Sequence, residues 1–210
     1  MKDRLLQIAT AAACGLALVT VGATPAAAHS DGVFQPPPPP PPSCVVHNDS
    51  QPISGIGSYS VPGGIKSYSI GMDDFRVSSK LGCVLHFVDA NTGAGTQQPA
   101  QFIVTIRTSN GVGGFNIVSQ QTVQAPVYIG GPPPIEHLVL PTALNLAWGT
   151  YYVSVMAVDT VWYWQLNLAH DGDGGRWYQN RDPSYGCYNT WGYLTQCALW
   201  DLYGYSFSLG

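Results

Sequence analysis

Asp171 and Asp173 have the spacing in this chain that best suits binding of a cation. They lie in the segment His170-Asp-Gly-Asp-Gly-Gly175, and carboxylates separated by one residue recur in loops that bind calcium. The downstream glutamate of a complete calcium loop is absent, and a tight polar hairpin explains the same residues through its glycines. We keep Asp171 and Asp173 as a calcium candidate and expect no other metal site and no cofactor.

The acidic and histidine residues elsewhere do not form a catalytic pattern. Asp73 and Asp74 are adjacent, so on a strand they point to opposite faces and cannot act as a paired acid and base. The pair Glu136 and His137 has the same limitation. No serine lies in a local frame that would activate its hydroxyl group. The sequence therefore predicts a protein that is not an enzyme.

All six tryptophans lie between Trp148 and Trp200. Trp162 and Trp164 alternate with Tyr163, so both indoles leave the same face of a predicted strand. Exposed there, and together with Trp177, they would stack on sugar rings and form a carbohydrate-binding site. The competing interpretation is that these large side chains fill the core.

The segment around Trp177 is rich in loops and aromatic residues. Trp177, Tyr178 and Tyr185 are therefore candidates for contact with a protein partner.

Residues 1–28 have the pattern of a secretory signal peptide. Lys2 and Arg4 precede an apolar stretch, which ends in the small residues 26–28. We expect a secreted, extracellular protein that is not inserted in a membrane after cleavage.

Four cysteines follow this leader, which suggests two disulfides in an exported chain. They allow three pairings, and the sequence alone does not choose among them. The short separation favours Cys187 with Cys197, and that pairing leaves Cys44 with Cys83.

The chain has 8 Lys and Arg against 12 Asp and Glu, a net charge of −4. This balance offers no basic patch, so neither nucleic acid nor an anionic membrane surface is an expected partner.

Residues 29–43 form a separate proline-rich arm. The unbroken run from Pro36 to Pro42 predicts a stiff polyproline II rod, spanning roughly 20 Å at about 3.1 Å per residue. It is explained as a solvated spacer, or as a tether that presents Val33 and Phe34 to a partner protein.

Residues 44–210 show strands and turns without helical periodicity. Phe102, Val104 and Ile106 alternate with polar residues, as in a half-buried antiparallel strand. The pattern predicts a single antiparallel β-sandwich of jelly-roll type. Strands are expected at residues 67–70, 83–88, 101–107, 115–118, 137–140, 150–156, 161–166 and 205–209.

Several short motifs occur in the order of a known group of domains. They are Met72-Asp-Asp-Phe75, the loop 110–114, Trp148-Gly-Thr-Tyr-Tyr-Val-Ser-Val155, the segment 162–164, Arg176-Trp-Tyr-Gln-Asn180, and Cys187 followed by Trp191 and Cys197. The series resembles secreted bacterial β-sandwich accessory domains with a "DDF" strand, a "GTYW" strand and a "WQNP…C…W" tail. The resemblance covers about residues 67–210, and it implies no catalytic residues. The chain departs from the pattern at Tyr152, where Trp is usual, and at Arg181, where Pro is usual.

A second likeness concerns architecture alone. A small exported sandwich behind a proline-rich arm is similar to the adaptor subunits of secreted umbrella toxin particles of bacteria. The sequence thus predicts a secreted, non-enzymatic protein-binding adaptor whose partners are other secreted proteins. A carbohydrate-binding module for cell-surface or polymeric glycans is the alternative.

Overall fold

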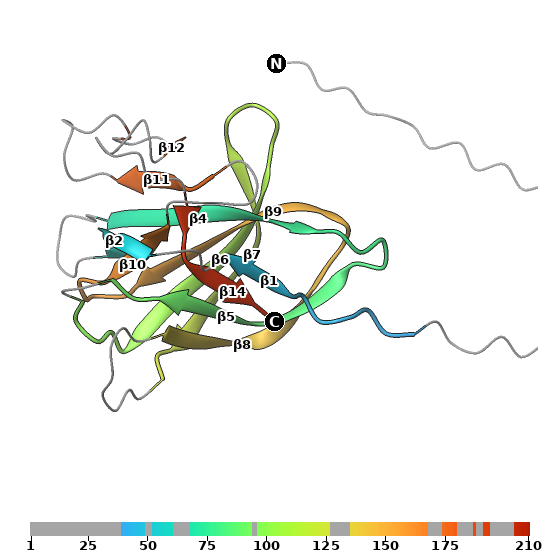
Figure 1. Ribbon diagram of the computed structural model, residues 1–210, viewed down its shortest axis with the longest axis horizontal. Helices are drawn as coiled ribbons and strands as arrows, with labels where there is room; N and C mark the ends of the chain where they lie inside the picture. Colours follow the sequence, from blue (N-terminus) through green and yellow to red (C-terminus); the bar gives the residue numbers. More distant parts are fainter. Residues whose placement is uncertain are drawn as a thin grey trace, which may run out of the picture. The chain divides into compact units, whose positions relative to one another are not determined.

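The chain folds as two antiparallel β-sheets packed together (Figure 1). The computed structural model describes residues 39–48, 52–60, 68–93, 96–126, 135–167, 174–179, 187, 191–193 and 204–210. No helix occurs among these residues, all of which belong to one unit, Pro39–Gly210. The predicted all-β sandwich is confirmed.

The larger sheet has seven strands in the order β12-β11-β4-β3-β9-β6-β7. Its pairings are antiparallel apart from one parallel pairing, between Tyr59 and Ala157. Strands β12 and β7 form its two edges. The strands are β3 (Tyr59–Ser60), β4 (Tyr68–Val77), β6 (Gln101–Ser109), β7 (Phe115–Gln124), β9 (Gly149–Ala157), β11 (Arg176–Gln179) and β12 (Gly192–Tyr193).

The second layer combines a four-stranded sheet, β1-β14-β5-β8, with a three-stranded sheet, β13-β10-β2. Backbone hydrogen bonds join the two: the Ser206 N–H donates to the Gln165 carbonyl, and the Asn91 N–H donates to the Ser206 carbonyl. We therefore describe them as one smaller sheet. Its strands are β1 (Val46–Asn48), β2 (Pro52–Gly57), β5 (Cys83–Asn91), β8 (Ile135–Leu146), β10 (Tyr163–Asn167), β13 (Gly204–Tyr205) and β14 (Phe207–Leu209).

Ser58 marks the point where the chain passes from the smaller sheet, in β2, to the larger sheet, in β3. Its N–H donates to the Trp162 carbonyl, and its own carbonyl accepts the Ala157 N–H. The hydroxyl donates to the Val155 carbonyl and accepts the Gly71 N–H. Ser58 is fully buried, and these four bonds satisfy its polar groups inside the core, as burial requires.

The core lies between the sheets and follows the alternation seen in the sequence. In β6, Phe102, Val104 and Ile106 are buried in it, whereas Arg107 is only half-buried. In the neighbouring β9, Val153 and Val155 are buried in the same core. Each such side chain stabilises the fold by about 1.5–3 kcal/mol.

A disulfide joins Cys44 to Cys83, which confirms the pairing predicted for these two cysteines. Beside it, the Val84 N–H donates to the Pro42 carbonyl and the Cys44 N–H donates to the Val84 carbonyl. The end of the proline run is therefore fixed to β5. Residues 29–38 of the arm, with Val33 and Phe34, lie outside the described residues.

Cys187 is buried and is also disulfide-bonded. Its predicted partner, Cys197, lies outside the described residues, so the pairing of these two cysteines stays a prediction.

Candidate functional site

Trp162 and Trp164 are fully buried, and this contradicts their interpretation as sugar-stacking residues. Their rings lie in the core with centroids 6.2 Å apart, and Trp164 packs on Tyr205 at 4.6 Å. The Trp162 indole N–H donates to the Thr92 hydroxyl, and that of Trp164 donates to a backbone carbonyl. The alternative, core filling, is the interpretation that the burial supports.

Trp177 is 9% exposed and belongs to the same core. Its indole N–H donates to the Ser69 hydroxyl. Both predictions for this residue, sugar stacking and partner contact, are therefore wrong. The physical reason is its position opposite Gly71 in the β11–β4 pairing, on the inward side of the sheet.

Tyr178, the next residue, is half-buried and belongs to the outward side. Its predicted role in partner contact stays a prediction. Tyr185 and the calcium candidates Asp171 and Asp173 lie outside the described residues. Within the described part of the chain, no group of three or more His, Cys, Asp or Glu could hold a metal ion.

The adjacent aspartates of β4 hold neighbouring segments in place. Asp73 accepts the backbone N–H of Tyr205 at 2.7 Å and that of Asp74 at 2.9 Å, whereas Asp74 accepts the Gly174 N–H at 3.0 Å. Burial, and then the negative charge of Asp73, raises the pKa of Tyr205 well above its ordinary value. Both aspartates are buried, and their contacts tie β13 and the segment that leads into β11 to β4.

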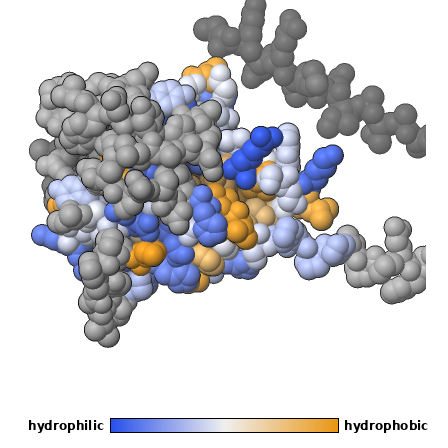
Figure 2. Space-filling model, in the orientation of Figure 1, coloured by the Kyte–Doolittle hydropathy of each residue, from blue (hydrophilic) through white to orange (hydrophobic). Residues whose placement is uncertain are grey.

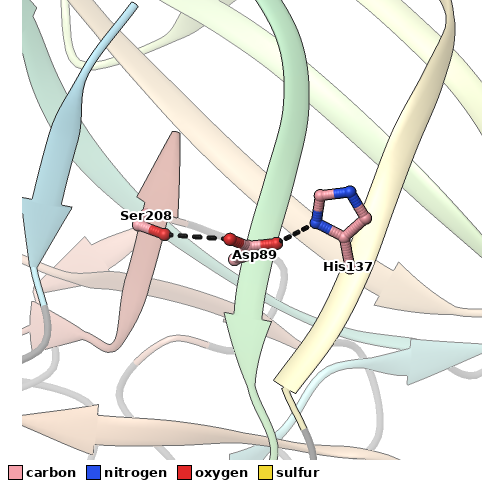
Figure 3. Close-up of polar contacts among 3 residues, drawn as sticks. All are labelled: Asp89, His137 and Ser208. Carbon is pink, nitrogen blue, oxygen red and sulfur yellow. Dashed lines mark hydrogen bonds and ion pairs between the residues drawn. The ribbon is translucent and has the colours of Figure 1, made fainter. Parts of the chain in front are cut away.

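Asp89, His137 and Ser208 form a polar row across the outer face of the smaller sheet (Figure 3). Asp89 lies in the middle: one oxygen is 2.6 Å from the His137 Nδ1, and the other accepts the Ser208 hydroxyl at 3.2 Å. His47 extends the row, because it pairs with Ser208 across β1 and β14.

This row does not have the geometry of a hydrolase triad. There the serine hydroxyl donates to the histidine ring, which removes its proton. Here the hydroxyl of Ser208 donates to the carboxylate, and Asp89 stands between the serine and the histidine. The arrangement orders surface side chains and does not activate a nucleophile.

Hydrophobic and hydrophilic residues are mixed over the coloured surface in Figure 2.

Glu136, beside this row on β8, is fully buried on the inward side. Neither carboxylate oxygen has a hydrogen-bond partner of standard geometry among the described residues. Burial raises the pKa of Glu136 above its ordinary value, and the nearby Gln98 side chain offsets part of this effect. Its charge is therefore costly to the fold at neutral pH.

The outer face of the larger sheet carries a cluster of two arginines and five aromatic residues, which we call the arginine–aromatic face. The Arg176 guanidinium lies 4.0 Å from the ring centroid of Tyr193, 5.4 Å from that of Phe115 and 5.8 Å from that of Tyr152. The face consists of Arg107, Phe115, Tyr152, Arg176, Tyr178, Trp191 and Tyr193.

Trp191 links Arg107 to the rings around Arg176. The Arg107 guanidinium lies 5.5 Å from the Trp191 ring, which contacts Phe115 at 5.9 Å and Tyr178 at 5.5 Å. Trp191 adjoins β12 and Phe115 begins β7, and these strands are opposite edges of the sheet. The larger sheet therefore curls until its two edges approach each other over this face.

Tyr152 is buried beneath the cluster, whereas Arg107, Phe115, Arg176, Tyr178, Trp191 and Tyr193 are half-buried. Partly exposed rings stacked with guanidinium groups are typical of residues that dominate protein interfaces. Sequence reasoning identified Tyr178 here but missed both arginines. The available signal was that Arg107 ends an alternating strand on its outward side, and that Arg176 directly precedes Trp-Tyr.

An open depression of about 170 Å³ lies beside the root of the arm, between Cys44 and Arg76. It is smaller than most small-molecule sites, which are about 300–1,000 Å³. Among the described residues there is also no helix that is long and apolar enough to cross a membrane.

Together these features define an antiparallel β-sandwich with an aromatic surface rich in arginine. Comparison with protein-family models, with curated proteins and with solved structures finds no match for the chain.

Proposed function

We propose that the protein is a secreted, non-enzymatic protein-binding module. It acts as an adaptor that links partners of an extracellular complex through its sandwich surface and its N-terminal arm. An antibacterial toxin particle is the kind of complex that the architectural likeness suggests.

The observation that carries this proposal is the arginine–aromatic face. Trp, Tyr and Arg are the residue types most enriched among those that contribute most to binding at protein interfaces. Here all of them except the buried Tyr152 are half-buried, and they are held by one another: Phe115 contacts Tyr152 at 4.8 Å, and Arg176 donates a hydrogen bond to the Tyr193 hydroxyl at 2.8 Å. A surface that is ordered before binding loses less conformational entropy when a partner docks.

The root of the arm supports the second part of the proposal. Pro42 is hydrogen-bonded to Val84, and the disulfide follows two residues later. The sequence predicts a stiff polyproline rod, and Pro42 at the end of this rod is fixed to β5. Such an arrangement suits a tether that holds one partner while the sandwich holds another.

The test begins with affinity capture of the full chain from the culture medium of the organism that makes it. The captured partner is identified by mass spectrometry and purified. Its affinity is then measured for the wild type, for Trp191→Ala and for Trp148→Ala.

Trp148 provides a matched control. It is 58% exposed and its ring lies 6.0 Å from the guanidinium of Arg76, so it has the same chemistry as Trp191 outside the arginine–aromatic face. We expect Trp191→Ala to weaken binding by about tenfold or more and Trp148→Ala to leave it unchanged. Equal binding by both variants would exclude the face as the docking surface.

The arm is tested by deletion of residues 29–38, which leaves the anchored end from Pro39 to Ser43 intact. Loss of one partner with retention of the other supports an adaptor. If capture instead yields glycans and no protein, the carbohydrate-binding alternative replaces the proposal.

A further inference from the structure

We propose that Arg107 and Arg176 form a binding site for carboxylates, and that the partner docks there through an acidic segment. This inference rests on the proposed function and specifies the chemistry of the partner at the arginine–aromatic face.

The two guanidinium groups come from distant parts of the chain and lie over neighbouring rings of one cluster. Arg107 lies on β6 opposite Tyr152 of β9, and Arg176 lies on β11 opposite Met72 of β4. Phe115 and Trp191 lie between them, at the contacts described above. The site therefore exists only in the folded, curled sheet.

Among the described residues, each arginine uses only part of its hydrogen-bonding capacity. A guanidinium carries five N–H donors. Arg107 donates to the Ser154 hydroxyl, and Arg176 donates to the Tyr193 hydroxyl. The Nε of Arg176 is buried without an acceptor in the described part of the chain. Donors already desolvated and still unpaired favour the arrival of an oxygen acceptor.

No carboxylate of the described residues forms an ion pair with either arginine. Asp74 lies on the same side of the sheet as Tyr152, but its Oδ1 accepts the Gly174 N–H. Burial lowers the pKa of Arg107 to about 10. Two half-buried cations on one face, with no ion-paired carboxylate among the described residues, therefore create a site that attracts anions.

The geometry favours carboxylate groups attached to a larger molecule. The planar fork of arginine binds a carboxylate through two parallel hydrogen bonds. The surrounding rings of Phe115, Trp191 and Tyr193 offer apolar area that a free ion would not use. Glutamate or aspartate side chains next to an aromatic residue would occupy both parts of the site.

The probe is a short peptide with two glutamates flanking a tyrosine, compared with the same peptide carrying glutamines instead. Binding to the full chain is followed by NMR, at the Nε–H signals of the two arginines and at the indole signal of Trp191. We expect saturable shifts with the glutamate peptide, a loss of affinity of about tenfold with the glutamine peptide, and weakening by added salt.

Variants locate the site. Arg107→Gln and Arg176→Gln should each reduce affinity for the glutamate peptide by about fivefold or more, and Arg107→Lys should recover part of it. Arg76→Gln is the matched control, because Arg76 is exposed and also contacts a tryptophan, but lies outside the face. Arg107→Gln should keep the thermal stability of the wild type, because it removes a half-buried charge that has no ionic partner among the described residues.

The outcomes separate this inference from the proposed function. Equal binding of the two peptides, or no shift with either of them, would overturn the carboxylate site while leaving adaptor function to the Trp191→Ala test. The same shifts with inorganic phosphate as with the glutamate peptide would show a general anion site and would also overturn it. Loss of peptide binding in Arg76→Gln would place the site elsewhere.

Discussion

Removal of the disulfide between Cys44 and Cys83 should lower the free energy of unfolding of the sandwich. The size of this loss depends on the length of the loop that the disulfide closes. The bond spans a sequence separation of 39 residues. In the loop-entropy model, closing a loop of that length removes about 13 cal/mol/K from the unfolded state, which corresponds to about 4 kcal/mol at 25 °C. For a domain of this size, that loss lowers Tm by roughly 8–16 °C.

The perturbation is the double variant Cys44→Ala/Cys83→Ala, because a single variant would leave a thiol able to attack the disulfide of Cys187. Unfolding by guanidinium chloride, followed by tryptophan fluorescence, gives the free energy of unfolding. Titration of free thiols checks that the second disulfide persists in both proteins. The amide hydrogen of Val84 should also exchange with solvent faster in the variant. Its hydrogen bond to the Pro42 carbonyl is then no longer held in place by the disulfide beside it.

A loss smaller than about 1 kcal/mol would refute the argument. It would mean that the unfolded chain already holds β1 near β5, or that strain in the folded state offsets the constraint. An equal loss on adding reductant to the wild type would not decide the matter, since reduction also opens the bond at Cys187.

Three further predictions concern buried groups. Trp164→Phe should cost about 2–4 kcal/mol in urea unfolding, because it removes core volume and the indole hydrogen bond, whereas the exposed Trp148→Phe should change stability by less than about 0.5 kcal/mol. Burial and the charge of Asp73 raise the pKa of Tyr205, so the free energy of unfolding should fall as pH rises above about 10, and less steeply in Tyr205→Phe. A parallel decline in both proteins would contradict this. Burial raises the pKa of Glu136 above 4.5, so its contribution to stability is complete below that pH and is lost as pH rises. Glu136→Gln should therefore be more stable than the wild type at pH 7 but not at pH 4, as measured by thermal unfolding; a gain of equal size at both values would exclude the charge as the cause.

The strands that the sequence predicted are those in which the alternation of apolar and polar residues within the segment is enough to indicate a strand. The alternation of Phe102, Val104 and Ile106 specifies a half-buried strand without reference to any partner. The segment Pro52–Gly57 was missed because its glycines weaken any strand pattern. It is a strand because β10 pairs with it and because Ser58 carries the chain across to the other sheet.

The side of the sheet that a residue faces could be predicted only relative to its neighbours. Period-two alternation places Trp162 and Trp164 together and Tyr163 opposite, but it does not say which set meets the second sheet. Packing against Phe102 and Tyr205, both distant in sequence, decides that the tryptophans are buried. For the same reason no local signal could bring Arg107 and Arg176 together.

The pairing of β1 with β14 also bears on how the molecule reaches its final state. Val46 lies opposite Leu209, so β1 cannot form its ladder until residues 207–209, which follow it much later in the chain, have been synthesised. Until then, β5 has unpaired backbone N–H and C=O groups on the side where β14 will pair with it. Another chain can form hydrogen bonds with such an edge. Molecules halted partway through synthesis should therefore associate through β5, and a holding chaperone that masks this strand would keep the nascent polypeptide competent to finish folding.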